Sequence, residues 1–272
     1  MAESLGYKNK RVIVSGCFSG MGEATARLLL KLGAEVHGLD YKKATLDLAS
    51  FNQVDLRDPA SIEASIDRIG GPVDALFNCA GLPQTAPPLD VMKVNFIGTR
   101  HLTGRVLPLM AKGGAIVSVS SNGGLGWRGR MPVLMELLKT DSFQASVAWC
   151  EANEDTVREG YALSKEAIIL WTMMASYQLI ERGIRINCTT PGPTQTPMMA
   201  EFEAATPRSV LDAAMQPINR RSTPDEQAGP LVFLNSEWAS YVNGVSFPVD
   251  GGFMAGIATG QIDLNSLMRR PA

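Results

Sequence analysis

A glycine-rich turn stands between a short apolar run and a helical stretch near the start of the chain. The run Lys10–Ser15 (KRVIVS) is rich in β-branched residues and predicts a buried strand. Gly16, Gly20 and Gly22 follow it, and a helical pattern continues to Gly33. Such glycines let the backbone approach a pyrophosphate, and the free N–H groups that begin the helix favour an anion. The arrangement predicts a dinucleotide-binding unit, although its G-x-x-x-G-x-G spacing leaves an ordinary strand-to-helix turn open.

Strand-like and helical runs then alternate along most of the chain. The alternation predicts one α/β domain over residues 1–272: a doubly wound Rossmann-type parallel sheet with helices on both faces. Helices are expected after the glycine turn, from Asp58, over Leu89–Met110, over Tyr161–Arg182 and from Thr223. The seven expected strands are Lys10–Ser15, Glu35–Leu39, Val54–Leu56, Val73–Phe77, Gly114–Ser121, Arg185–Thr190 and Gly244–Val249.

The alternation breaks at about residues 126–156, ahead of the helix that contains Tyr161. Two further helices are expected there, over Pro132–Lys139 and Ser142–Glu151. A surface hairpin with its own small core and a wall of the substrate pocket are both compatible with this apolar segment. We expect the two helices to wall the pocket, and a contact with a partner subunit is the other role left open for their apolar residues. A second irregular stretch, at about 193–217, is expected to form short helices over the mouth of a cleft.

Composition excludes several classes of function. The net charge of -2 and the pI near 5.8 give no electrostatic reason to expect nucleic acid or an anionic membrane. No apolar stretch approaches the length of a membrane span, and the beginning of the sequence has no signal core, so we expect a cytoplasmic protein. Four scattered cysteines predict reduced thiols. His37 and His101 lack partners at metal-ligand spacing, so no metal is expected.

Asp40 ends the second expected strand, 18 positions after Gly22. An acidic residue about 20 positions beyond the glycine turn is placed to bind the 2′-hydroxyl of an adenosine ribose. A carboxylate accepts a hydrogen bond from that hydroxyl and repels a 2′-phosphate, so Asp40 predicts NAD rather than NADP. Lys42 and Lys43 follow closely and weaken this preference.

Tyr161 and Lys165 are four residues apart in a long apolar run. If the run is helical, both side chains rise from one face. A free tyrosine hydroxyl titrates near pKa ~10. A neighbouring ammonium is expected to lower the pKa of Tyr161 toward neutrality and make the pair competent for proton transfer. A simple surface contact is the alternative that the pair alone leaves open.

Together these motifs resemble the short-chain dehydrogenase/reductase superfamily over residues 10–252. Ser15 to Gly22 is similar to the family's cofactor fingerprint, with serine where threonine is usual. Asn78-Cys79-Ala80-Gly81 is similar to its Asn-Asn-Ala-Gly segment, and Pro191 through Thr196 to its Pro-Gly motif. The resemblance implies cofactor binding by Gly16, Ser19, Gly20, Met21, Gly22, Asp40, Asp55, Leu56, Asn78, Ala80, Gly81, Tyr161, Lys165, Pro191, Gly192, Thr194 and Thr196.

The resemblance also implies a catalytic tetrad of Asn95, Ser121, Tyr161 and Lys165. The family usually separates its serine and tyrosine by about a dozen residues, whereas Ser121 and Tyr161 are 40 apart. The excess is the segment 126–156, and the chain looks most like the insertion-bearing branch that includes 3α-hydroxysteroid dehydrogenase/carbonyl reductase. The longer spacing makes Ser120 a competitor for the serine, and strand alternation favours Ser121.

The activity implied by the resemblance is NAD(H)-dependent interconversion of a secondary alcohol and a ketone. Tyr161 would exchange the proton, Lys165 would lower its pKa and bind the nicotinamide ribose, Ser121 would hydrogen-bond the substrate oxygen, and Asn95 would complete a proton relay. A bulky cyclic or steroid-like substrate is expected. A 3-oxoacyl-type ketoreductase and a non-catalytic nucleotide-binding sensor are the alternatives. The family often assembles through the helices that contain Asn95 and Tyr161, so a homodimer or homotetramer is expected.

Overall fold

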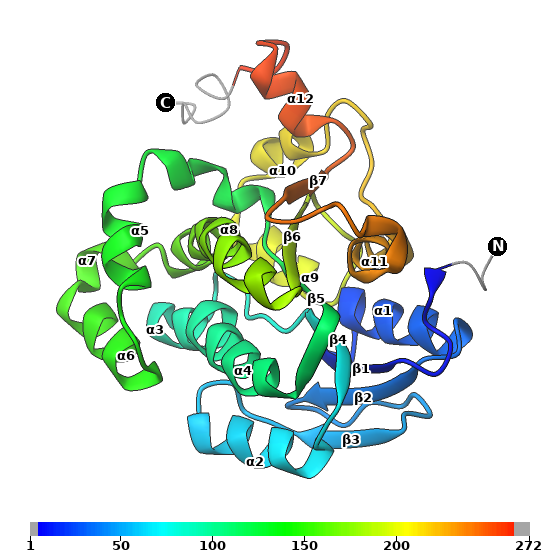
Figure 1. Cartoon of the computed structure of the whole chain (residues 1–272). Helices are drawn as coiled ribbons and strands as arrows, with labels where there is room; N and C mark the ends of the chain where they lie inside the picture. The colour runs from blue at the N-terminus through cyan, green and yellow to red at the C-terminus, as the bar shows by residue number, and fades with distance from the viewer. Residues whose placement is uncertain (1–4, 264–272) are drawn as a thin grey trace.

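Seven parallel strands form one sheet in the order β3-β2-β1-β4-β5-β6-β7 (Figure 1). This computed structural model describes residues 5–263. The chain moves outward from β1 to β3 and then returns to β4 on the other side of β1, which creates a crevice at the carboxyl ends of these two strands. The strands are β1 Arg11–Ser15, β2 Glu35–Asp40, β3 Ser50–Gln53, β4 Val73–Asn78, β5 Met110–Val119, β6 Arg185–Pro191 and β7 Ser246–Val249.

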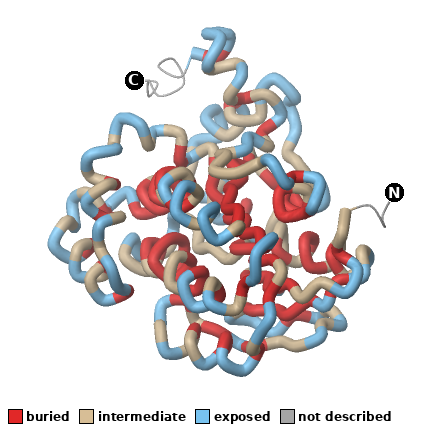
Figure 2. Tube along the Cα trace, in the orientation of Figure 1, coloured by how far each residue is buried: buried red, intermediate tan, exposed pale blue. Residues whose placement is uncertain are grey.

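Helices cover both faces of the sheet, which confirms the predicted Rossmann-type fold. Alternate side chains of β1 pack on opposite faces of the sheet: Val12 and Val14 belong to one apolar cluster and Ile13 to the other. Figure 2 shows the buried residues gathered along the strands and on the adjoining helices. The cluster of Val12 includes residues of α1 (Gly20–Lys31) and α11 (Pro224–Asn235), and the cluster of Ile13 includes residues of α2 (Pro59–Ile69), α4 (Thr99–Val106) and α8 (Gly160–Leu179).

Two boundaries differ from the sequence prediction. The third strand covers Ser50–Gln53, so the prediction of a strand over Val54–Leu56 is wrong. The latter residues come after the strand, where only the Val54 N–H still extends the ladder by donating to the Asp40 carbonyl at 2.9 Å. The predicted helix Leu89–Met110 is interrupted: α3 (Pro88–Met92) passes into a π-helical segment, Lys93–Gly98, before α4 begins.

Asp58 and Thr223, at which two helices are expected to start, cap those helices in the structure. The Asp58 carboxylate accepts the Ala60 N–H at the start of α2. At the start of α11, Thr223 and Glu226 form a reciprocal capping box. These local interactions set the starting points of helices that pack on opposite faces of the sheet.

The inserted segment forms three helices: α5 (Met131–Leu138), α6 (Phe143–Ala152) and the short α7 (Glu154–Val157). In Figure 1 they lie outside α3, α4 and α8. Leu134, Leu137 and Phe143 are buried in one cluster with Phe96 of the π-helical segment and with residues of α8. The segment therefore covers the outer faces of the two helices that carry Asn95 and Tyr161.

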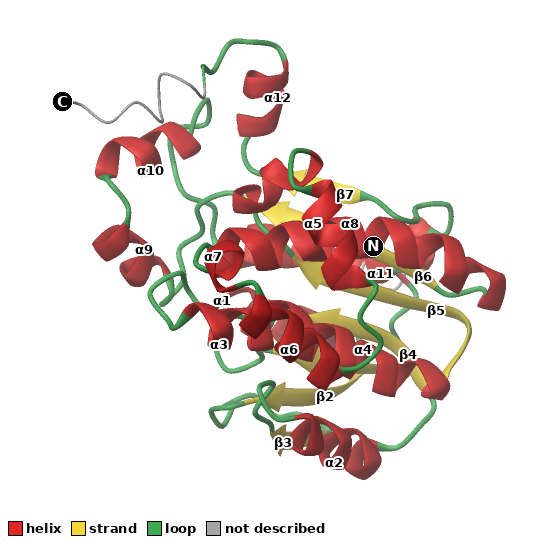
Figure 3. Ribbon diagram, turned by 90° about the vertical axis from the view of Figure 1, so that its left-hand side faces the viewer, coloured by secondary structure: helices red, strands yellow, loops and turns green. Residues whose placement is uncertain are grey.

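The stretch after β6 forms α9 (Met199–Ala205) and α10 (Arg208–Ala214), as expected around Pro207. Both helices, together with α12 (Phe253–Ala258), stand off from the layered body in Figure 3. Within residues 5–263, no helix is long and apolar enough to cross a bilayer. All four cysteines carry free thiols.

The burial of α5 generates a stability prediction. Leu137 is 0% exposed, so Leu137→Ala removes packed methyl groups and leaves a cavity. Such truncations cost about 2–5 kcal/mol of unfolding free energy, to be measured by urea denaturation. Met131→Ala, on the same helix at a residue that is 39% exposed, is the matched control and is expected to change stability much less. Equal losses in the two variants would contradict the packing of α5 on the body.

Candidate active site

The turn after β1 leaves no room for a Cβ at Gly16 or Gly22. A Cβ on Gly16 would lie 2.6 Å from the Ala80 backbone nitrogen, and one on Gly22 would lie 2.1 Å from the Gly16 carbonyl oxygen. Gly16 and Gly20 also adopt φ values of +76° and +63°, which side chains rarely tolerate. The turn thus lies directly against the segment after β4 and presents bare backbone at the start of α1.

A cavity of about 460 Å³ opens above this turn at the switch point of the sheet. Its walls include most of the residues for which sequence reasoning predicts cofactor contact: Gly16, Ser19, Gly20, Met21, Gly22, Asp40, Asp55, Leu56, Ala80, Gly81 and Thr196. Asn78 is not among them, because its side-chain Nδ2 donates to Thr103 and Ser118 inside the fold. The shape, glycine cradle and helix start fit the phosphates and adenosine of a dinucleotide.

Asp40 lies at the rim of this cavity with both carboxylate oxygens engaged by backbone groups. Oδ2 accepts the Phe18 N–H at 2.9 Å and Oδ1 accepts the Lys42 N–H at 2.9 Å. The Lys42 ammonium lies 5.5 Å from the centre of the Phe18 ring. Asp40 therefore fixes the glycine turn and places a negative charge at the cavity.

Arg57 is a residue of this site that sequence reasoning missed. Its guanidinium donates to both carboxylate oxygens of Asp55, from Nε at 3.0 and 3.2 Å and from Nη2 at 2.8 Å. It also contacts Asp90 at 3.3 Å and lies 6.0 Å from the centre of the Tyr41 ring. This pairing lowers the pKa of Asp55. The available signal was local, since Arg57 stands two positions after Asp55.

Lys165 and Tyr161 project from one side of α8, as their spacing predicts. Lys165 is 4% exposed, and its ammonium donates to the Val119 carbonyl at 2.9 Å at the end of β5. The same ammonium lies 5.6 Å from the centre of the Tyr161 ring. A Cβ on Gly81 would lie 3.8 Å from Lys165 Nζ, which places the ammonium at the edge of the cavity. Burial lowers the pKa of Lys165 to about 8.

The pKa of Tyr161 differs from the sequence expectation. Burial raises it above its ordinary value, while a hydrogen bond with Ser121 acts in the opposite direction. The expected lowering by Lys165 is not seen, because desolvation disfavours the phenolate more strongly than its surroundings stabilise it. The protein alone therefore keeps the tyrosine protonated.

The two candidate serines have different surroundings. Ser121 follows β5, and its hydroxyl accepts the Gly123 N–H at 3.0 Å beside Tyr161. The Ser120 hydroxyl instead donates to the Lys165 carbonyl at 2.7 Å and is 2% exposed. Ser120 thus binds the backbone of α8, while Ser121 is the serine whose hydroxyl meets the tyrosine.

Asn95 lies within the π-helical segment and is 1% exposed. Its side chain accepts the Leu82 N–H at 2.7 Å and donates to the Leu82 carbonyl at 3.1 Å. A further contact of 3.3 Å reaches the Ser164 hydroxyl on α8. Asn95 thereby links the loop after β4 to the tyrosine helix.

The two threonines after β6 occupy different places. Thr196 lines the cavity, and its Cγ2 would lie 3.1 Å from a Cβ on Gly20 across the opening. Thr194 is buried and donates to the Gly192 carbonyl at 2.9 Å, with a second contact of 2.9 Å to Ser222. Neither Pro191 nor Gly192 is among the residues that line the cavity.

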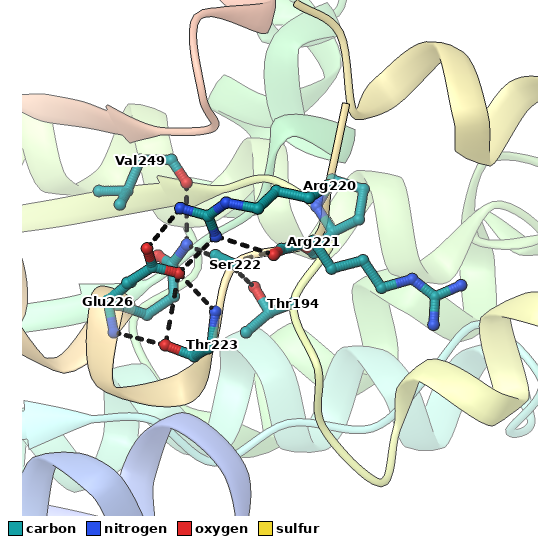
Figure 4. Close-up of polar contacts among 9 residues, drawn as sticks. Thr194, Arg220, Arg221, Ser222, Thr223, Glu226 and Val249 are labelled. Carbon is teal, nitrogen blue, oxygen red and sulfur yellow. Dashed lines mark hydrogen bonds and ion pairs between the residues drawn. The ribbon is translucent and has the colours of Figure 1, made fainter. Parts of the chain in front are cut away.

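Figure 4 shows the network that supports Thr194. The Gln227 side-chain amide donates to the Ser222 hydroxyl at 2.9 Å and to the Val249 carbonyl at 2.9 Å. Beside it, Arg220 pairs with Glu226, the residue of the α11 capping box. The Thr194 hydroxyl is bound within this network, so Thr194 serves to hold the loop rather than to line the cavity.

A parallel sheet with a glycine cradle at its switch point and a tyrosine, lysine and serine beside it defines a nucleotide-binding oxidoreductase. Comparison with models of protein families identifies the family of this oxidoreductase. A model described as short chain dehydrogenase matches residues 10–133, and one described as enoyl-(acyl carrier protein) reductase matches residues 136–254. The chain belongs to the short-chain dehydrogenase/reductase family.

Individual relatives cover nearly the whole chain. Coniferyl-alcohol dehydrogenase from Pseudomonas sp. is 37% identical over 245 residues, which cover 90% of this chain and 96% of that protein. The 3-alpha-hydroxysteroid dehydrogenase/carbonyl reductase of Comamonas testosteroni is 29% identical, with 90% and 96% covered. The crystal structure of a 3-alpha-hydroxysteroid dehydrogenase from Pseudomonas sp. B-0831 with NADH aligns at a TM-score of 0.78 and 28% identity, covering 93% of this chain and 99% of that one.

The buried ammonium predicts a pH-dependent change in stability. A pKa of about 8 in the folded protein, against about 10.5 when exposed, means that the charged Lys165 costs about 3 kcal/mol below pH 8. This cost disappears as pH rises from 8 toward 10.5, so Lys165→Met is expected to stabilise the cofactor-free protein most at pH 6–7. Denaturant titrations between pH 6 and 10 measure the difference, with exposed Lys139→Met as the control. A difference that does not change with pH would contradict the burial of a charged ammonium.

Proposed function

We propose that the protein is an NAD(H)-dependent oxidoreductase that interconverts a secondary alcohol and its ketone. The observation that carries this proposal is the meeting of Tyr161, Lys165 and Ser121 beside the dinucleotide-sized cavity. The tyrosine hydroxyl has a hydrogen-bond partner and an ammonium close to its ring, and the segment after β4 brings the cavity to the same place. Proton exchange with an alcohol or carbonyl oxygen is the chemistry that this arrangement supports.

NAD(H), when bound, exchanges a hydride with the substrate carbon. The glycine turn and the start of α1 would hold its pyrophosphate, and Asp55 and Leu56 would lie beside the adenine. Asp40 would accept a hydrogen bond from the ribose hydroxyl. The orientation of Asp40, with its oxygens held by backbone N–H groups, supports NAD rather than NADP.

The side chains divide the remaining tasks of the reaction. In the reductive direction, Tyr161 donates its proton to the ketone oxygen, and the raised pKa of its hydroxyl favours this protonated starting state. Ser121 hydrogen-bonds the same oxygen as charge develops on it. Lys165 stabilises the phenolate that results, and Asn95 holds the loop at Leu82 while completing a proton path to solvent.

The proposed substrate carries a bulky cyclic group. Two relatives are named for coniferyl alcohol and for 3-alpha-hydroxysteroids, which are both alcohols built on ring systems. The helix α9, whose Phe202 ring lies against Tyr161, would provide the surface against which such a group packs. A panel of ketones and secondary alcohols followed by NADH absorbance tests the substrate class.

We still expect a cytoplasmic protein that assembles as a homodimer or homotetramer. Subunits of this family often associate through the helices that contain Asn95 and Tyr161. Because α5 and α6 cover these helices here, we expect the subunits to assemble through another face. Sedimentation velocity of the intact chain tests this; a strict monomer would reject it.

Tyr161→Phe tests the proposed activity most directly. The substitution removes the hydroxyl and keeps the ring, so turnover is expected to fall by about 10²–10⁴-fold while NADH binding, measured by fluorescence titration, is retained. A variant that keeps more than a tenth of the wild-type rate would show that Tyr161 is not the general acid.

Cofactor preference is tested by kinetics with NADH and NADPH. Placing a 2′-phosphate against the Asp40 carboxylate should cost several kcal/mol, which favours NADH strongly in kcat/KM. Asp40→Asn keeps an acceptor oxygen and removes the charge, so it is expected to improve the use of NADPH. Equal or better wild-type efficiency with NADPH would refute the assignment.

A further inference from the structure

The helix α9 lies over the candidate catalytic tyrosine. Only two of its side chains turn inward: Met199 is buried and Phe202 is half-buried, whereas the other five residues are exposed. These two residues are three positions apart and so lie on one face of the helix. The Phe202 ring lies 5.0 Å from the Tyr161 ring, centre to centre, at an edge-on angle of 74°.

Polar contacts tie α9 to the opposite side of the cleft. The Thr85 hydroxyl donates to the Glu201 carboxylate at 2.9 Å, and the Gln84 amide donates to the Thr206 hydroxyl at 2.7 Å. Gln84 and Thr85 belong to the loop after β4, which Asn95 holds at Leu82. The helix therefore spans the cleft, from the loop after β6 on one side to the loop after β4 on the other.

These ties are easily broken. Gln84, Thr85 and Glu201 are exposed, and hydrogen bonds at exposed positions contribute little net stability because water replaces them. Glu203 of α9 also pairs with Arg221, and an ion pair near the surface likewise contributes little stability. A substrate that approaches the Tyr161 hydroxyl can thus lift α9, but it must first replace the contact between Phe202 and Tyr161.

The chemistry of α9 restricts what can make that replacement. Its charged side chains are two carboxylates, Glu201 and Glu203. Glu203 is paired with Arg221, so the Glu201 carboxylate is the one that disfavours an anionic substrate nearby. An aromatic ring can exchange one edge-to-face contact with Phe202 for another of equal quality. A saturated ring of the same size fills the space without that electrostatic match.

We propose that Phe202 is a specificity-determining residue that selects uncharged alcohols and ketones carrying an aromatic ring. The proposal rests on the proposed function, since it takes Tyr161 as the group that meets the substrate oxygen. Phe202 forms the inner surface of a lid, α9, that Gln84 and Thr85 hold closed over the bound ring.

A matched pair of ketones tests the role of Phe202. The wild-type protein is assayed with NADH on 4-phenylbutan-2-one and 4-cyclohexylbutan-2-one, which differ only in the aromaticity of a remote ring. We expect kcat/KM to favour the phenyl compound. Phe202→Leu is expected to reduce this preference by roughly 2- to 10-fold, the scale of one aromatic contact, whereas Phe202→Tyr should retain it.

The lid contacts supply an internal control. The double variant Gln84→Ala/Thr85→Val leaves the aromatic surface intact, so KM should rise for both ketones by a similar factor while the phenyl preference is unchanged. A change in the preference in this variant, equal to that of Phe202→Leu, would overturn the specific role of Phe202.

The outcomes separate this inference from the proposed function. If wild type turns over ketones in a Tyr161-dependent way and Phe202→Leu leaves the phenyl preference unaltered, the inference fails and the function stands. If no ketone or alcohol in the panel is turned over, the proposed function itself fails. The preference for the phenyl over the cyclohexyl ketone can also be measured without turnover. Calorimetry gives the affinity of the Tyr161→Phe protein for each ketone in the presence of NADH.

Discussion

A reciprocal pair of hydrogen bonds between the end of β5 and one residue of α8 organises the candidate site. The Lys165 ammonium donates to the Val119 carbonyl, and the Ser120 hydroxyl donates to the Lys165 carbonyl. Side chain and backbone of the same lysine are thus both bound to consecutive residues of the strand end. Because Ser121 follows directly and Tyr161 is one helical turn before Lys165, the pair sets the distance at which serine and tyrosine meet. The turn beyond them is held equally closely, since a Cβ on Gly124 would lie 2.9 Å from the Lys165 carbonyl carbon.

How far the sequence predicts this molecule depends on whether a feature is local. The order and type of the main elements follow from alternating apolar periods and from caps such as Asp58, which act within a few residues. The third strand was misplaced, because Val54 and Leu56 look strand-like but owe their burial to the core beyond the strand end. The π-helical turn at Asn95 was also missed, since π-helical turns are rare and occur as single turns inside α-helices.

Within the site, residue type was predicted better than orientation. Both Thr194 and Thr196 belong to a motif, yet only Thr196 faces the cavity; the difference arises from Ser222 and Gln227, which lie far along the chain. Phe202 was missed for the same reason, because its ring meets Tyr161 only through the fold. Arg57 was missed although its main partner, Asp55, lies two positions before it. The inserted helices show a related limit: their apolar character was evident from the sequence, but the surface of α3, the π-helical segment and α8 that they cover was not.

The electrostatics of Tyr161 and Lys165 point to a division of work between the protein and its ligand. Burial raises the pKa of the tyrosine and lowers that of the lysine, so each group is pushed toward its uncharged form. A proton that leaves Tyr161 would create a phenolate in a dry site whose nearby cation is itself only partly favoured. In the proposed reaction, a cationic nicotinamide ring would supply a further positive charge during alcohol oxidation, whereas ketone reduction would use the tyrosine as an acid. The fold therefore favours the protonated tyrosine that the proposed reduction requires, and the proposed oxidation would depend on the charge that the cofactor brings.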